Sequence, residues 1–159
     1  VRAWLRADPR AIAAAIDEPA VAEAAPPPWT GASHGHSGPG DVGVDGLRLL
    51  IVEDAVLLAM ELEAGLVEAG AVVVGCAAEL GEAMAMLDLP IDAAVLDANL
   101  NGESVAPLAE ALRARGTPFV FATGYGERGA PEGFDVPVVR KPYNVHQIVN
   151  ALAEAVGRG

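Results

Sequence analysis

From residue 47 onward, short apolar runs alternate with segments whose apolar residues recur at helical spacing. The runs that we interpret as strands are residues 47–52, 71–76, 93–96, 119–122 and 136–140. Each run is almost continuously apolar, which is typical of parallel strands buried on both faces.

The intervening segments have the pattern of amphipathic helices. Residues 55–69 carry Leu58, Leu62 and Leu66 at four-residue spacing, and Gly70 follows as a helix-ending glycine. Further helices are expected over residues 79–87 and 104–114, and after an N-cap at Asn144. Strands that alternate with helices predict an α/β fold, a doubly wound five-stranded parallel sheet with right-handed crossovers.

The segment after the fourth strand departs from this alternation. Residues 124–133 contain four glycines and a proline, and both residue types disfavour a helix interior. We therefore expect a loop with at most one helical turn, so that helix four is short or missing.

The first 46 residues have a different composition. Residues 24–46 are rich in Pro, Gly and Ser, which predicts a flexible linker, and Asp8-Pro9 resembles the start of a short helix. We assign residues 1–46 to an N-terminal extension and linker, and residues 47–159 to one folded domain. His34 and His36 lie in the linker, where we expect solvated side chains and not metal ligands.

Charge and composition narrow the classes of partner. The net charge of −12 opposes binding to nucleic acid. No apolar run reaches the roughly 18 residues that span a bilayer, and no signal peptide is readable. We expect a cytoplasmic protein with neither membrane nor nucleic acid partners. Its single cysteine, Cys76, lies in an apolar run and is predicted to be a small core residue.

Polar side chains that could bind a ligand or take part in catalysis directly follow the predicted strands. Glu53 and Asp54 come after strand one, Asp97 after strand three, Thr123 after strand four and Lys141 after strand five. Ligands of doubly wound sheets gather at this carboxyl edge. The positions therefore predict one shared site.

Three acids at one edge require compensation. Two carboxylates about 5 Å apart repel by roughly 3 kcal/mol at an effective dielectric constant of about 20. Mg²⁺ is a hard cation that suits one or two carboxylates together with waters. With Lys141 and the Thr123 hydroxyl close by, Asp97 would become a phosphoryl acceptor that forms an aspartyl phosphate.

Each residue alone has a simpler interpretation as a helix-terminal acid, a turn residue or a surface charge. Their common position after strands favours a site. A phosphohydrolase with an aspartyl intermediate would need a second acid soon after the nucleophile, but Ala98 and Asn99 stand there. A cofactor-binding flavodoxin is also disfavoured, because no phosphate-binding loop follows strand one.

The motifs around these residues resemble the receiver domain of two-component response regulators. They are LLIVED at 49–54, VLD at 95–97, FAT at 121–123 and KP at 141–142. The resemblance covers residues 47–157 and implies the flavodoxin-like receiver fold, with strand order 2-1-3-4-5.

The resemblance also implies a role for each site residue. Asp97 would be the phosphoacceptor, Asp54 a direct Mg²⁺ ligand and Glu53 a ligand through water, and the backbone carbonyl of Asn99 would complete the metal site. Thr123 would be the switch hydroxyl. Lys141 would bind the phosphoryl group and form a cis peptide bond with Pro142.

Residues 118–126, PFVFATGYG, resemble the FATGUY receivers of alphaproteobacteria. These occur as stand-alone receivers or with histidine kinases of the HWE class. The implied partner is a sensor histidine kinase or a phosphotransfer protein. The implied function is a phosphorelay receiver that is not an enzyme beyond its own phosphotransfer and dephosphorylation. No DNA-binding output module is readable after the receiver, and the sequence does not indicate an oligomeric state.

Three departures from the general receiver pattern support an alternative. Leu100-Asn101 and an early Gly102 shorten the loop after Asp97, and Val138 replaces the usual aromatic residue of strand five, leaving Tyr125 as the substitute switch candidate. The glycine-rich stretch replaces helix four. The alternative is a protein-interaction module independent of phosphorylation. The phosphorylation-switched receiver would use a contact face formed by residues 123–133, strand five and the last helix.

Overall fold

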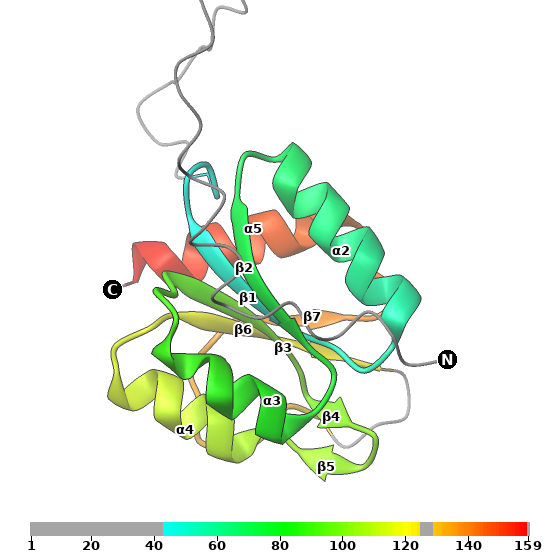
Figure 1. Cartoon of the computed structure of the whole chain (residues 1–159), viewed down its shortest axis with the longest axis vertical. Helices are drawn as coiled ribbons and strands as arrows, with labels where there is room; N and C mark the ends of the chain where they lie inside the picture. Colours follow the sequence, from blue (N-terminus) through cyan, green and yellow to red (C-terminus); the bar gives the residue numbers. More distant parts are fainter. Residues whose placement is uncertain (1–42, 125–128, 159) are drawn as a thin grey trace, which may run out of the picture. The chain divides into compact units, whose positions relative to one another are not determined.

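The computed structural model describes residues 43–124 and 129–158. The linker up to residue 42, the helix expected after Asp8 and the switch candidate Tyr125 lie outside the described residues. The last linker residues, 43–46, are described, and Val44 is buried in the core of the domain, so the folded part begins before residue 47. The central sheet has five parallel strands in the order β2-β1-β3-β6-β7 (Figure 1). The strands are β1 (Arg48–Val52), β2 (Val72–Ala77), β3 (Ala93–Asp97), β6 (Phe119–Thr123) and β7 (Val138–Arg140). This confirms the doubly wound sheet with the predicted strand order.

Helices cover both faces of the sheet. They are α2 (Val56–Glu68), α3 (Leu80–Ala85) with a following 3-10 turn (Met86–Asp88), α4 (Ala106–Ala114) and α5 (Val145–Gly157). Helices α2 and α5 lie on one face, and α3 and α4 on the other (Figure 1). In β1, Leu49 and Ile51 join the α2–α5 core, whereas Leu50 and Val52 join the other core. Strands with both faces covered are continuously apolar, as the sequence pattern predicted.

A helix-free segment precedes β7. Residues 129–137 contain no helix. Over the part of this loop that the structure describes, this agrees with the prediction that the helix after the fourth strand of the sheet is short or missing. The ring of Phe134 takes the place of a helix face by packing edge-on against Phe119 and Phe121, with centroid distances of 5.8 and 5.7 Å. Three interlocked aromatic rings thereby close the sheet face next to α4.

A small hairpin follows β3 where the sequence analysis expected only a short loop. It consists of β4 (Asn99–Leu100) and β5 (Glu103–Ser104), paired antiparallel. Asn101 has φ of 52° and Gly102 has φ of 88°. Two consecutive residues with positive φ form the tight turn that Asn-Gly favours. The hairpin also delays the start of the next helix to Ala106, two residues later than predicted.

The prediction that Cys76 is a core residue is wrong. Its side chain is exposed, because β2 is an edge strand whose neighbouring positions are only partly covered. The thiol lies 3.8 Å from the Glu63 carboxylate. In the described part of the chain, no helix is long and apolar enough to cross a lipid bilayer.

Candidate functional site

The carboxyl ends of the parallel strands bring the predicted polar residues to one edge of the sheet. Val52 pairs with Leu96, Asp97 with Ala122, and Thr123 with Arg140. The buried polar or charged residues of the described chain are Glu53, Asp97 and Thr123, with 4%, 2% and 6% of their surface exposed. Every one of them lies at this edge. Such burial is costly for polar groups unless partners compensate for lost water.

Lys141 supplies part of that compensation. Its Nζ lies 2.6 Å from Asp97 Oδ2 and 2.9 Å from Glu53 Oε2. Burial would lower the pKa of Lys141, but the hydrogen bonds to Asp97 and Glu53 outweigh burial and raise this pKa above its usual value. The ammonium group therefore stays charged and holds the two carboxylates together.

The acids outnumber this single cation. Glu53, Asp54 and Asp97 each offer an oxygen, and these oxygens lie within 4.8 Å of one another. Burial raises the pKa of Glu53 to about 7, and the charge of Asp97 adds to the shift, although hydrogen bonds from Lys141 and the Ala55 N–H oppose it. The cluster thus has an excess of negative charge that a divalent cation would balance.

The hairpin after β3 is tied to the acids through its backbone. The Asn99 N–H donates to Asp97 Oδ1 at 3.0 Å, and the Asn101 N–H donates to Asp54 Oδ2 at 2.9 Å. The Gly102 N–H in turn donates to the Asn99 side chain at 2.7 Å. Sequence reasoning missed this contribution; the available signal was the Asn101-Gly102 pair, a strong hairpin dipeptide.

The remaining expected residues lie around this centre. Thr123 ends β6, and its carbonyl accepts a hydrogen bond from the Lys141 N–H at 2.8 Å. The peptide bond between Lys141 and Pro142 is cis. The roles assigned to the Thr123 hydroxyl and to the Asn99 carbonyl remain predictions.

Tyr143 is a neighbour of the site that the sequence analysis did not identify. Its hydroxyl is buried without a hydrogen-bond partner in the described part of the chain. Burial, followed by the charge of Glu53, raises the pKa of Tyr143 to about 12. The available signal was its position directly after Lys141-Pro142.

An exposed apolar patch lies beside the acids. Val56, Leu57 and Met60 occupy the first turns of α2, with 55%, 79% and 59% of their surface exposed. Since α2 begins two residues after Asp54, this patch borders the acidic cluster. Contiguous exposed apolar side chains of this kind are typical of protein contact surfaces.

Comparison with solved structures found similar proteins, whereas no family model and no curated protein matches the chain. SdrG from Sphingomonas melonis Fr1 is 43% identical over 70% of this chain and 96% of SdrG, with a TM-score of 0.63. The BeF3-activated conformation of SdrG from Pseudomonas melonis Fr1 is also 43% identical, over 70% of this chain and 98% of that one, with a TM-score of 0.59.

Two more distant structures share the fold. The response regulator PhyR from Brucella abortus is 27% identical over 74% of this chain, with a TM-score of 0.60, and the match spans 50% of PhyR. A response regulator receiver protein from Sinorhizobium medicae WSM419 is 22% identical over 70% of this chain and 95% of its own length, with a TM-score of 0.61. The last likeness concerns the fold alone.

Proposed function

The chain belongs to the receiver-domain family of response regulators, and on this premise we propose that Asp97 accepts a phosphoryl group in a Mg²⁺-dependent reaction. One observation carries the proposal. The buried Asp97 carboxylate lies 2.6 Å from Lys141 Nζ, and its oxygens are within 4.8 Å of those of Glu53 and Asp54. A nucleophilic carboxylate flanked by a cation and by further oxygen ligands is suited to phosphoryl transfer.

The chain's own residues orient and stabilise the transfer. An Asp97 oxygen attacks phosphorus and forms the new O–P bond, while the bond between phosphorus and the donor breaks and its electron pair leaves with the donor. The Asn99 N–H, which donates to Asp97 Oδ1, keeps the carboxylate oriented. Lys141 remains protonated and can bind a phosphoryl oxygen, and the Thr123 hydroxyl would bind another.

The donor set at this edge fits Mg²⁺. Glu53, Asp54, Asp97 and the Asn99 carbonyl would hold the ion, since all of them offer oxygen and the three acids share only one lysine. When bound, Mg²⁺ would neutralise negative charge that develops on the phosphoryl oxygens. The BeF3-activated conformation recorded for SdrG makes the same phosphoryl-mimicking reagent a useful probe of this chain.

The phosphodonor in this proposal is a histidine kinase or a phosphotransfer protein. The exposed patch of Val56, Leu57 and Met60 beside the acids gives such a protein an apolar surface to dock on while its phosphorylated side chain reaches Asp97. The run at 118–126 extends the proposal to the FATGUY subtype and to HWE-class kinases. Phosphorylation would then change protein contacts, and the chain would catalyse only its own phosphotransfer and dephosphorylation.

Intact-protein mass spectrometry after incubation with acetyl phosphate tests the proposal. The wild-type chain should gain one phosphoryl group with Mg²⁺ and none with EDTA. Asp97→Asn should gain none in either condition. Asp88→Asn, which changes an exposed aspartate outside the site, is the matched control and should label like the wild type. Equal labelling of the Asp97→Asn variant, or labelling in EDTA, would contradict the proposal.

A second candidate function is protein interaction without phosphorylation. It is favoured because the carboxylates of the site already have partners within the chain: Lys141 and two hairpin N–H groups bind Asp97 and Asp54. The exposed Val138 in β7 also leaves no buried aromatic switch at that position. Pull-down of partners with and without BeF3 separates the two functions. Capture that changes with BeF3 in the wild type but not in Asp97→Asn supports the switch, and capture indifferent to both supports the alternative.

A further inference from the structure

One buried side-chain polar atom in the described part of the chain lacks a partner, and it belongs to a neighbour of the proposed phosphoryl site. The hydroxyl of Tyr143 is shielded from solvent and has no hydrogen-bond partner among the described residues. A buried hydroxyl without a partner costs free energy, so native proteins contain few such groups. An orphaned donor beside a functional site suggests that it finds its partner in another state of that site.

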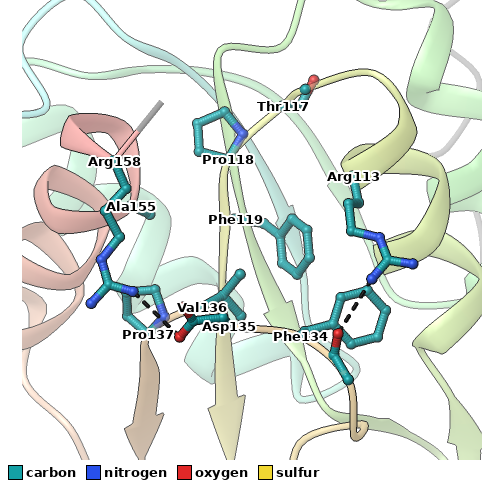
Figure 2. Close-up of a pocket in the computed structure, with 12 residues that line it drawn as sticks. Arg113, Thr117, Pro118, Phe119, Phe134, Asp135, Val136, Pro137, Ala155 and Arg158 are labelled. Atoms are coloured by element: carbon teal, nitrogen blue, oxygen red, sulfur yellow. Dashed lines mark hydrogen bonds and ion pairs between the residues drawn. The ribbon is translucent and has the colours of Figure 1, made fainter.

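Side chains at the other end of the sheet are already paired. A cavity of about 440 Å³ lies there beside the buried Phe119, and Figure 2 shows an arginine on either side of it. The ion pairs of these arginines are Arg113–Glu110, Arg158–Glu154 and Arg158–Asp135. Among the described residues, no side chain of the lining leaves a buried polar atom without a partner, so nothing in this cavity indicates a ligand.

The chain on both sides of Tyr143 is anchored. The Lys141 N–H donates to the Thr123 carbonyl at 2.8 Å. On the other side, Asn144 and Gln147 form a capping box at the start of α5, in which the N–H of each donates to the side chain of the other at 2.9 and 3.0 Å. The Tyr143 ring packs against the core between the sheet, α2 and α5. These contacts hold the phenol in place beside the site.

Glu53 is the buried acceptor that the structure offers to this hydroxyl. Its side chain is 2% exposed, and its charge acts on the Tyr143 phenol more strongly than that of any other residue. The charge of Glu61 also reaches the phenol, but Glu61 is exposed and is solvated by water. Glu53 Oε2 is paired with Lys141 at 2.9 Å, and its Oε1 accepts from the Ala55 N–H at 3.1 Å. While Lys141 stays with it, Glu53 needs no further donor.

Phosphorylation would change this balance. Lys141 Nζ is shared between Glu53 and Asp97 Oδ2, which lies 2.6 Å away. Once Asp97 carries a phosphoryl group, negative charge moves outward to the phosphoryl oxygens, and the ammonium group would follow it. Glu53 would then stay buried with one donor fewer, which is costly for a carboxylate.

We propose that the Tyr143 hydroxyl donates a hydrogen bond to the Glu53 carboxylate when Lys141 moves to the phosphoryl group. This inference rests on the proposed function and makes Tyr143 a positioning residue of the phosphorylated state. In the unphosphorylated state the orphaned hydroxyl raises the free energy of the protein, so the new bond favours the phosphorylated state. Phenylalanine at this position would pack in the same way but would supply no donor.

Binding of BeF3 with Mg²⁺ to the full chain, followed by fluorine NMR, tests the inference. Without BeF3, Tyr143→Phe should unfold at the same or a higher urea concentration than the wild type, because it loses an unpartnered group. With Mg²⁺, its affinity for BeF3 should fall by roughly fivefold, the size expected for one hydrogen bond. Tyr143→4-aminophenylalanine restores an N–H donor and should recover affinity. Thr117→Val removes a hydroxyl at the opposite end of the sheet and should leave the affinity unchanged.

The outcomes separate this inference from the proposed function. A wild type that binds no BeF3 would overturn both. If the wild type binds BeF3 and Tyr143→Phe binds it equally well, the inference alone fails. It also fails if Tyr143→Phe unfolds at lower urea concentration without BeF3, since the hydroxyl would then have a partner in the unphosphorylated state, or if the amino analogue binds BeF3 no better than Tyr143→Phe.

Discussion

Two ion-pair systems lie at opposite ends of the sheet and differ in how their charges are arranged. At the carboxyl edge, Lys141 is shared between two buried acids. At the amino edge, the guanidinium of Arg48 binds both oxygens of Asp92 at 2.9 Å, and the Arg48 N–H also donates to Asp92. The first system holds two buried carboxylates together at the proposed phosphoryl site. The second fastens the start of β1 to the residue that precedes β3.

The Arg48–Asp92 pair predicts a pH-dependent contribution to stability. Hydrogen bonds from the Arg48 side chain and backbone lower the pKa of Asp92 from 3.8 to about 2. A carboxylate whose folded pKa is depressed stabilises the fold above its unfolded pKa, and this stabilisation is lost as pH falls through the folded value. Asp92→Asn should therefore unfold at lower urea concentration than the wild type at pH 7, and the difference should shrink as pH falls from about 4 towards 2. A difference that stays constant with pH would contradict this electrostatic origin, and Asp88→Asn serves as the control.

At the scale of elements, two glycines decide how the helices and the hairpin are placed. Helix α2 passes α5 at Gly65, where a built Cβ would lie 2.3 Å from a methyl carbon of Val145. The hairpin turn needs positive φ at Gly102. The first glycine is required by a neighbour, and the second by its own backbone conformation.

Gly65→Ala should destabilise the protein although alanine favours helices. The helix propensity gain of about 1 kcal/mol is opposed by an overpacking cost of roughly 1–3 kcal/mol against Val145. Adding Val145→Ala should recover part of the loss, which a double-mutant cycle of urea unfolding measures. If the two changes are simply additive, the contact between α2 and α5 does not explain the glycine.

Gly102→Ala and Gly81→Ala form a matched pair, and we expect them to change the free energy of unfolding in opposite directions. A Cβ at either position meets no atom within 4 Å, but Gly102 has φ of 88°. The left-handed conformation costs alanine roughly 1–2 kcal/mol, so Gly102→Ala should lower the free energy of unfolding. Gly81 lies in α3, where alanine should stabilise by up to about 1 kcal/mol. Denaturant unfolding of both variants checks the contrast, and destabilisation by both would refute it.

At the scale of the whole molecule, the two ends of the sheet differ in the side chains that they bury. The carboxyl edge concentrates buried charge around Asp97, whereas the amino end is closed by aromatic packing and contains the cavity. The connection between β6 and β7 joins these ends. Because its described part has no helix, Phe134 contributes much of the apolar cover that a helix would provide.

Phe134→Ala should therefore destabilise the molecule without removing the phosphoryl site. We expect a loss of about 2 kcal/mol, below the range for fully buried aromatics, because the ring is only partly buried. Phe134→Leu should cost less. Urea unfolding measures the loss, and acetyl phosphate labelling below the unfolding transition should match the wild type. Loss of labelling in the folded variant would show that the two ends are coupled.

The sequence by itself determined the strands and the polar residues that follow them, and the resemblance of its motifs to receiver domains supplied the strand order. Continuous apolar runs, glycine stops and the polar residues after each strand are local signals. Parallel topology with right-handed crossovers then leaves few arrangements for Glu53, Asp54, Asp97 and Lys141. The glycines of residues 124–133 also predicted that the helix after the fourth strand of the sheet would be short or missing.

Only the tertiary structure decided the contacts between segments far apart in the chain. These include the sharing of Lys141 between Glu53 and Asp97, the hydrogen bond from Asn101 to Asp54, and the exposure of Cys76. The cavity beside Phe119 belongs to the same class. Each depends on which strand is at an edge and on how closely backbones approach. Packing sets these quantities, and no local pattern of residues encodes them.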